Sequence, residues 1–247
     1  MWPSVLAHAI PLEPGEGGHQ NLVITLTTLG VLSATLIGLW IGNLAQRRLA
    51  LPAAAFAAGA LLLLAHDLLK ESATLGQGIL QNPLLVGTLL LAFAGGMLLL
   101  PTAKPRDATR IAWLWTIGIA LHTAGEGLVL GSEANTADLT GVLGIASFLL
   151  HKLLEAATIP LVANAALANR TTIATSGTLA AVALASTIMG ATRSSGNLTL
   201  ILFAAGAGAT LYAILLLANR APMTLRHTAY ALAGFLTIYA AGLLHET

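Results

Sequence analysis

The chain has 247 residues, of which 56% are hydrophobic and only 9% are charged. A soluble domain carries about 25% charged residues, so this composition excludes an ordinary soluble protein and predicts a membrane protein. The net charge of +1 provides no basic surface for a nucleic-acid partner. The absence of cysteine excludes disulfide bonds, thiolate metal sites and cysteine nucleophiles.

Eight apolar stretches follow one another along the chain, each near the ~20 residues that a helix needs to cross a bilayer. They cover residues 22–45, 50–71, 83–101, 111–131, 140–168, 173–191, 198–218 and 225–245. Runs such as LLLLA at 61–65 lack the alternation of barrel strands, and backbone groups in lipid favour helices. The prediction is an all-α membrane protein: an eight-transmembrane-helix bundle at 22–247, after an extracytoplasmic lead-in at 1–21.

Basic residues in the connections predict the orientation of the bundle. They are Arg47, Arg48, Lys104, Arg106, Arg110, Arg170, Arg220 and Arg226. All lie on one side of an eight-helix topology, and the other side holds only Arg193. Because cytoplasmic loops carry an excess of Lys and Arg, we expect both termini to lie outside. The expected location is the plasma (inner) membrane, as a multi-pass integral protein.

Ionisable residues remain inside three of the apolar stretches. They are His66, Asp67, Lys70 and Glu71 in the second, His122 and Glu126 in the fourth, and His151, Lys152 and Glu155 in the fifth. A charge at the bilayer centre costs roughly 3 kcal/mol, and such residues usually mark a substrate path. The first group lies near the end of its stretch. The alternative to a substrate path is that its side chains extend to the membrane–water interface. The other two groups lie near the middle of the membrane.

The spacing of the two central groups predicts a metal site. His122 and Glu126 are four residues apart, and His151 and Glu155 repeat that spacing on the next stretch. Each pair therefore lies on one helical face, and two antiparallel helices can direct both pairs to one point. Imidazole suits transition metals, and two carboxylates neutralise a divalent ion. The alternative is a structural bundle in which each His–Glu pair is only hydrogen-bonded.

The same segments resemble a known family. His122-Thr-Ala-Gly-Glu126-Gly-Leu-Val-Leu-Gly131 and His151-Lys-Leu-Leu-Glu155-Ala resemble the paired signatures of the ZIP (Zrt/Irt-like) divalent metal transporters. His66-Asp-Leu-Leu-Lys-Glu71 resembles a third family segment but lacks its proline. The resemblance implies a 3+2+3 arrangement with inverted repeats, metal flux toward the cytoplasm and a homodimer.

Two positions depart from the family pattern. Many members hold a second metal ion with polar or acidic residues directly after the two histidines, where this chain has Thr123 and Lys152. A lysine ammonium has no free lone pair for a metal. We therefore expect a single-metal site in which Lys152 takes the place of a second cation and pairs with Glu126 or Glu155. The alternative is that Lys152 points elsewhere.

The sequence thus predicts a transporter that uses alternating access, and not an enzyme. The expected metal ligands are His122, Glu126, His151 and Glu155, with Thr123, Lys152, His66, Asp67 and Glu71 beside the site or on the ion's path. Two imidazoles and two carboxylates make Zn²⁺ the leading substrate, with Fe²⁺, Mn²⁺, Co²⁺ and Cd²⁺ as alternatives. No cofactor is expected beyond the transported metal, and the expected partners are that ion, membrane lipid and a second copy of the chain.

An enzyme of another class is the alternative function. An intramembrane zinc-dependent hydrolase would use the same cluster to hold a metal with an open water position. It would also need a separate general acid or base, for which His66 and Asp67 are the nearby candidates in the sequence.

Overall fold

The computed structural model describes residues 17–75, 82–99, 108–133, 140–192, 196–218 and 224–246. Within these ranges the chain forms seven helices and no strand. The helices are α1 (Gly17–Leu75), α2 (Pro83–Leu99), α3 (Ala108–Glu133), α4 (Thr140–Ala163), α5 (Asn169–Thr192), α6 (Gly196–Ala218) and α7 (Leu225–Glu246). The all-α prediction is confirmed. Residues 1–16 of the predicted lead-in lie outside the described ranges, and α1 already begins at Gly17.

Three of the described helices are long and apolar enough to cross a membrane. They are the 43-residue segment Thr28–Lys70 of α1, α5 and α6. This supports the prediction of a membrane protein, because segments of this length and hydropathy bury poorly in a soluble fold. The eight-helix count, the 3+2+3 arrangement and the plasma membrane stay predictions.

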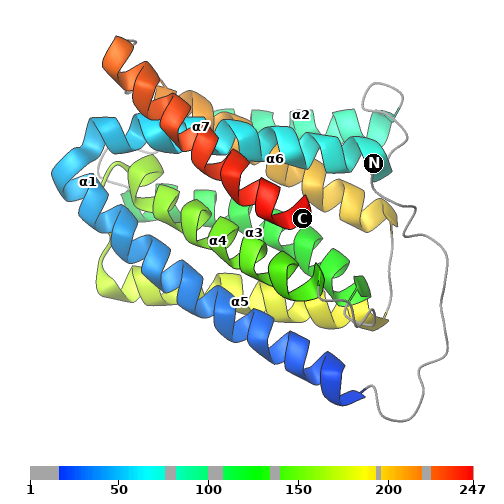
Figure 1. Cartoon of the computed structure of the whole chain (residues 1–247). Coiled ribbons are helices and arrows are strands. Elements are labelled where there is room, and N and C mark those ends of the chain that lie inside the picture. The colour runs from blue at the N-terminus through cyan, green and yellow to red at the C-terminus, as the bar shows by residue number, and fades with distance from the viewer. Residues whose placement is uncertain are drawn as a thin grey trace.

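The segment labelled α1 contains two of the predicted helices. We expected them to be separated at residues 46–49, and they meet at a kink at Leu49, where the backbone is non-helical with φ −138° and ψ 33°. Pro52 follows three residues later, and a proline ring clashes with the carbonyl four residues before it, here that of Arg48. The backbone therefore turns at this point without a loop, and the two arms of α1 cover the two predicted stretches (Figure 1).

The end of α4 was also predicted wrongly, because the helix stops at Ala163 and not at residue 168. Asn164 takes a left-handed conformation with φ 55°, which asparagine tolerates at the residue after a helix. Its side-chain oxygen accepts a hydrogen bond from Gln46 Nε2 at 3.3 Å, and Asn43 Oδ1 accepts one from the backbone of Leu167 at 2.7 Å. Both contacts fasten the α4–α5 turn to the first arm of α1.

Glycines allow two pairs of helices to pack with their backbones in contact. On α1, Gly38 and Gly42 lie against the carbonyl groups of Leu153 and Ala157 of α4. A side chain at either glycine would collide with this backbone, as is typical of close helix packing in membranes. The first arm of α1 therefore supports α4 along the part that carries His151 and Glu155.

The second close pair is α3 and α5. Gly127 of α3 lies against Ser186 of α5, and further along both helices Gly131 lies against the carbonyl of Thr187. Because residue numbers increase together along both contacts, α3 and α5 run parallel. The part of α3 that carries His122 and Glu126 is thus held by α5.

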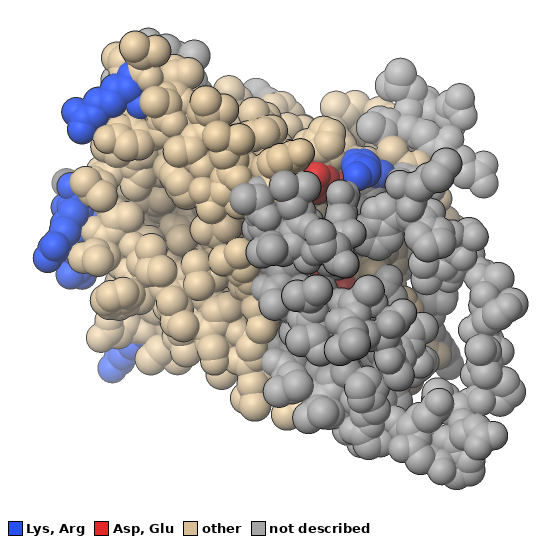
Figure 2. Space-filling model, in the orientation of Figure 1, with Lys and Arg blue, Asp and Glu red and all other residues tan. Residues whose placement is uncertain are grey.

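The described arginines gather at one end of the bundle, which we call the arginine end. They are Arg47, Arg48, Arg110, Arg170 and Arg226. They lie at the bend of α1 and at the starts of α3, α5 and α7 (Figure 1). Figure 2 shows basic side chains along the left edge of the view, and a further basic side chain lies beside an acidic one away from that edge. The start of α1 and the end of α7 point to the opposite end (Figure 1). Most of the visible described surface in Figure 2 carries neither acidic nor basic residues.

Candidate metal centre

Two antiparallel helices bring the central ionisable residues together inside the bundle. His122 and Glu126 come from α3, and His151, Lys152 and Glu155 come from α4. The side chain of Lys152 is 0% exposed, whereas those of His151 and Glu126 are 21% and 16% exposed. A buried cluster of this kind is costly unless its charges are paired.

Three of the four predicted ligands converge closely. The Nε2 atoms of His122 and His151 lie 3.4 Å apart, and Glu155 Oε1 lies 3.4 Å from the first and 3.6 Å from the second. Ligand atoms that bind zinc tetrahedrally at 2.0–2.1 Å are separated by roughly 3.3 Å. The His/His/Glu cluster therefore has the edge lengths of a tetrahedral metal site, and its ligand atoms all lie within 4.8 Å of one another.

Glu126, the fourth predicted ligand, lies at the border of this cluster. Its Oε1 lies 3.1 Å from Nε2 of His122, a distance that also fits one tetrahedral edge. It does not belong to the three-residue group whose ligand atoms are all mutually close. In this conformation three of the four predicted ligands are mutually close, and Glu126 is close to one of them.

Lys152 lies between the two carboxylates on the side away from the histidines. Its Nζ lies 2.5 Å from Oε2 of Glu126 and 2.5 Å from Oε2 of Glu155. Each glutamate therefore directs one oxygen to a histidine and the other to the ammonium. The interpretation in which Lys152 pairs with these glutamates agrees with this geometry, and the alternative in which it points elsewhere does not.

The charge of the cluster favours a cation. Two carboxylates against one ammonium leave one net negative charge when both imidazoles are neutral. Because these groups are screened little by water, the unbalanced charge acts strongly on whatever enters. A divalent ion placed between the two Nε2 atoms and Glu155 would lie where the lone pairs converge and would change the net charge of the cluster from −1 to +1.

A glycine on α6 fixes the position of His122. A Cβ atom at Gly206 would lie 2.8 Å from the Cβ of His122, so only glycine allows α6 to approach this closely. The Phe203 ring lies one turn earlier on α6, with its centroid 6.0 Å from that of the imidazole. Together they form an apolar wall behind the first ligand.

A hydrogen bond joins α3 to α4 on the arginine side of the cluster. Trp115 lies seven residues before His122, and its Nε1 donates to Thr158 Oγ1 at 2.8 Å. Thr158 lies seven residues after His151 and donates to the carbonyl of Glu155 at 2.6 Å. The chain of contacts therefore ends on the backbone of a predicted ligand.

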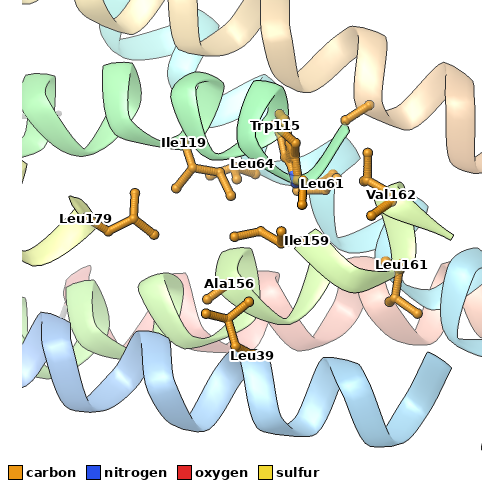
Figure 3. Close-up of a cluster of buried hydrophobic side chains, with 14 of the residues drawn as sticks. Leu39, Leu61, Leu64, Trp115, Ile119, Ala156, Ile159, Leu161, Val162 and Leu179 are labelled. Carbon is orange, nitrogen blue, oxygen red and sulfur yellow. The ribbon is translucent and has the colours of Figure 1, made fainter. Parts of the chain in front are cut away.

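Apolar side chains fill the space around this hydrogen bond. Figure 3 shows Trp115 and Ile119 of α3 and Ile159 of α4 directed toward one another, with Leu61 and Leu64 of α1 beside them. At 1.5 Å per residue, the layer reaches from about 5 Å to about 10 Å beyond His122 toward the arginine end. It closes the cluster on that side.

The other predicted residues have different positions. Nδ1 of His66 lies 3.2 Å from Oδ1 of Asp67, and both side chains are exposed, at 68% and 47%. Among the described residues, neither side chain bonds to the cluster. The side chain of Glu71 lies outside the described part of the structure. Thr123 is fully buried beside His122, and its hydroxyl has no hydrogen-bond partner within the described ranges.

Sequence reasoning missed Trp115, Thr158 and Gly206. The first two are separated by 43 positions, so no local spacing connects them. Gly206 lies within the run GAG at 206–208, which indicates close helix packing but not which residue it faces.

Comparisons with known proteins add no identification. No model of a protein family matches the chain, and no curated protein matches it significantly.

Proposed function

We propose that this protein transports a divalent transition-metal ion across the membrane, with zinc as the leading substrate. The observation that carries the proposal is the convergence of His122 Nε2, His151 Nε2 and Glu155 Oε1 at separations of 3.4–3.6 Å. These are the separations of ligands around one tetrahedral ion. The cluster lies inside a bundle of apolar helices, where ionisable residues usually mark the path of a substrate or ion.

The cluster fits a metal better than it fits a purely structural hydrogen-bond network. A structural His–Glu pair needs one nitrogen and one oxygen in contact. Here two imidazole nitrogens face each other at 3.4 Å and share one carboxylate oxygen. Two such nitrogens cannot bond to one another and to the same oxygen with good geometry, whereas a single cation satisfies all three.

Lys152 supports a site for one ion. Its ammonium occupies the position between Oε2 of Glu126 and Oε2 of Glu155, which is where two bridging carboxylates would hold a second cation. In the single-ion proposal, Lys152 pairs with both glutamates when the transported ion has left and reduces their net charge from two negative charges to one. The empty transporter then changes conformation without two unpaired carboxylates in the membrane.

Transport is favoured over the alternative of an intramembrane hydrolase. A hydrolase needs a general base next to the metal-bound water. The two candidate bases, His66 and Asp67, form an exposed pair of their own, and both glutamates of the cluster are engaged by Lys152. The chemistry at this cluster is therefore binding and release.

The direction and the assembly complete the proposal. We place the arginine end in the cytoplasm, because positively charged connections are retained there, and the flux toward it. The resemblance of the α3 and α4 segments to ZIP transporters supports alternating access and a homodimer. Ligand type alone leaves iron, manganese, cobalt and cadmium as further substrates.

Zinc flux into sealed liposomes tests the proposed function. Purified protein should carry zinc across the membrane, and His151→Ala and Glu126→Ala should each abolish most of this flux while folding normally. The control is His227→Ala, which removes an imidazole that bonds to Thr224 at the start of α7, outside the predicted site residues, and should leave the flux unchanged. Unchanged flux in both cluster variants would refute the mechanism, and cleavage of a lipid or peptide without flux would favour the hydrolase.

A further inference from the structure

Buried hydroxyl groups in this protein normally bond to the backbone of their own helix. Thr35, Thr116, Thr187 and Thr210 each donate to the carbonyl four residues earlier, at 2.7–2.8 Å. This is the usual way for Ser and Thr to satisfy a hydroxyl in an apolar helix. It provides a standard within the same molecule against which other hydroxyls can be judged.

Three fully buried hydroxyls depart from this standard. Thr123 on α3 and Thr175 on α5 are 0% exposed, as is Ser176, and none has a hydrogen-bond partner among the described residues. The hydroxyl oxygen of Thr172, one turn earlier on α5, is also buried without a partner among the described residues, although Thr172 as a whole is half-buried. Within the described ranges, the other buried side-chain atom without a partner is Nδ1 of His122 in the cluster itself, since Oε2 of Glu126 is paired with Lys152.

The packing of α3 on α5 places these hydroxyls on one side of the cluster. Gly127 lies level with Ser186 on the parallel neighbour. Eleven residues earlier on both helices, Thr175 of α5 therefore lies level with Thr116 of α3. Thr116 is six residues before His122, which is about 9 Å along the helix axis at 1.5 Å per residue. Because α3 and α5 both begin at the arginine end, Thr175 and Ser176 lie between the cluster and that end. Thr123 lies at the level of the cluster.

A buried hydroxyl without a partner costs free energy, so its retention at several neighbouring positions needs a reason. We propose that Thr123, Thr175 and Ser176 line the passage by which the metal ion leaves the centre toward the arginine end. They supply oxygen atoms to an ion that is regaining its hydration shell. The inference rests on the proposed function, and it adds the residues of the exit route and the face of α5 that it uses.

Other surfaces near the cluster suit a hydrated ion less well. A hollow that reaches His151 and Glu155 from the side of α7 is lined mainly by Ala60, Leu61, Leu64, Leu154 and Ile238. The layer at Trp115 and Ile119 is equally apolar. The hydroxyls on α5 are the described polar groups that lead from the cluster toward the arginine end without a hydrogen bond of their own. In this closed conformation they lack partners, and they gain them when the passage opens.

Isosteric removal of the hydroxyls separates a role in transport from a role in folding. Ser176→Ala and Thr175→Val delete unpaired groups, so thermal stability in detergent should stay the same or rise. Zinc flux into sealed liposomes should fall by about three- to tenfold, the effect of losing one hydrogen bond to the moving ion. Thr175→Ser keeps the hydroxyl and should retain flux. A structural role would instead lower stability and flux together.

Thr187→Val provides the matched control on the same helix. This hydroxyl is equally buried but bonded to the carbonyl of Ala183, and by the register with α3 it lies on the other side of the cluster. Its removal should lower stability slightly and leave flux unchanged. If Ser176→Ala and Thr175→Val show normal flux while His151→Ala abolishes it, the exit route is wrong and the proposed function stands. Flux that survives His151→Ala would overturn the proposed function as well.

Discussion

The ammonium of Lys152 on α4 lies 2.5 Å from Oε2 of Glu126 on α3, so a single positive charge joins the two helices that carry the centre. The same nitrogen lies 2.5 Å from Glu155 on its own helix. The cluster is thus paired before any metal ion enters. If the cluster transports an ion as we propose, it must be stable in both its loaded and its empty state, and this lysine stabilises the empty state.

Replacement of Lys152 by methionine should therefore destabilise the metal-free protein. Removing one partner from a buried ion pair costs about 3–5 kcal/mol, because the remaining charges lose their compensation. Zinc would compensate the two glutamates in its place, so the metal-induced rise in melting temperature should be larger in Lys152→Met than in the wild type. Thermal unfolding with and without zinc measures this. Lys70→Met, which removes an exposed lysine of α1, is the control. If zinc raised the melting temperature of Lys152→Met and of the wild type by the same amount, the prediction would be wrong.

The number of bound ions gives a second prediction from the same lysine. Wild-type protein should bind one zinc ion at the centre, because Lys152 fills the space between Oε2 of Glu126 and Oε2 of Glu155. Lys152→Asp removes that cation and adds a carboxylate, so it should bind two. Calorimetry on the purified protein gives the stoichiometry. Two tightly bound ions in the wild type would show that Lys152 does not replace a cation.

Much of the centre could be predicted from the sequence, because its geometry is local. A spacing of four residues places His122 and Glu126 on one helical face, and consecutive helices joined by a short connection run antiparallel. The repeat at His151 and Glu155 then directs both pairs to one region. The structure added that Lys152 joins both carboxylates, whereas the sequence left open which of them it would contact.

Other features could not be predicted, because they depend on contacts between distant segments. The two predicted helices of α1 meet directly at the kink at Leu49, whereas the charged pair Arg47 and Arg48 favoured a short connection there. The early end of α4 depends on Asn164, whose left-handed conformation is held by Gln46 of α1. The unpaired hydroxyls of α5 are also invisible in sequence, since most serines and threonines in these helices bond to their own backbone.

The glycine behind the first ligand provides a third prediction. A methyl group at Gly206 would lie 2.8 Å from the Cβ of His122, and neither α3 nor α6 can yield without moving the imidazole. Gly206→Ala should therefore reduce zinc flux and weaken zinc binding even though alanine favours helix formation. Gly177→Ala is the control, because a Cβ there meets no atom within 4 Å. The idea would be wrong if both variants transported zinc equally well.

The hydrogen bond between Trp115 and Thr158 provides a fourth prediction, about closure at the arginine end. Trp115→Phe keeps an aromatic ring in the apolar layer but removes the donor to Thr158. The closed form should lose about 1 kcal/mol, so the layer should open several times more often. The chain has no cysteine, so a thiol introduced by Ile119→Cys is unique and reports access through its alkylation rate.

Alkylation of that thiol should be faster in the Trp115→Phe background than with Trp115 present. Thr116→Val, which loses a hydroxyl bonded only to its own helix, is the matched background and should leave the rate unchanged. Equal rates in all three proteins would mean that the hydrogen bond does not hold the layer closed.

The central claim is that His122, His151 and Glu155 hold a divalent ion between them. Anomalous scattering at the zinc edge, from crystals of the protein soaked with zinc, tests it most directly. The account predicts one peak at about 2.0–2.1 Å from Nε2 of both histidines and within bonding distance of Glu155, with Glu126 drawn toward it. A zinc peak elsewhere in the protein, with these three side chains unliganded, would contradict it.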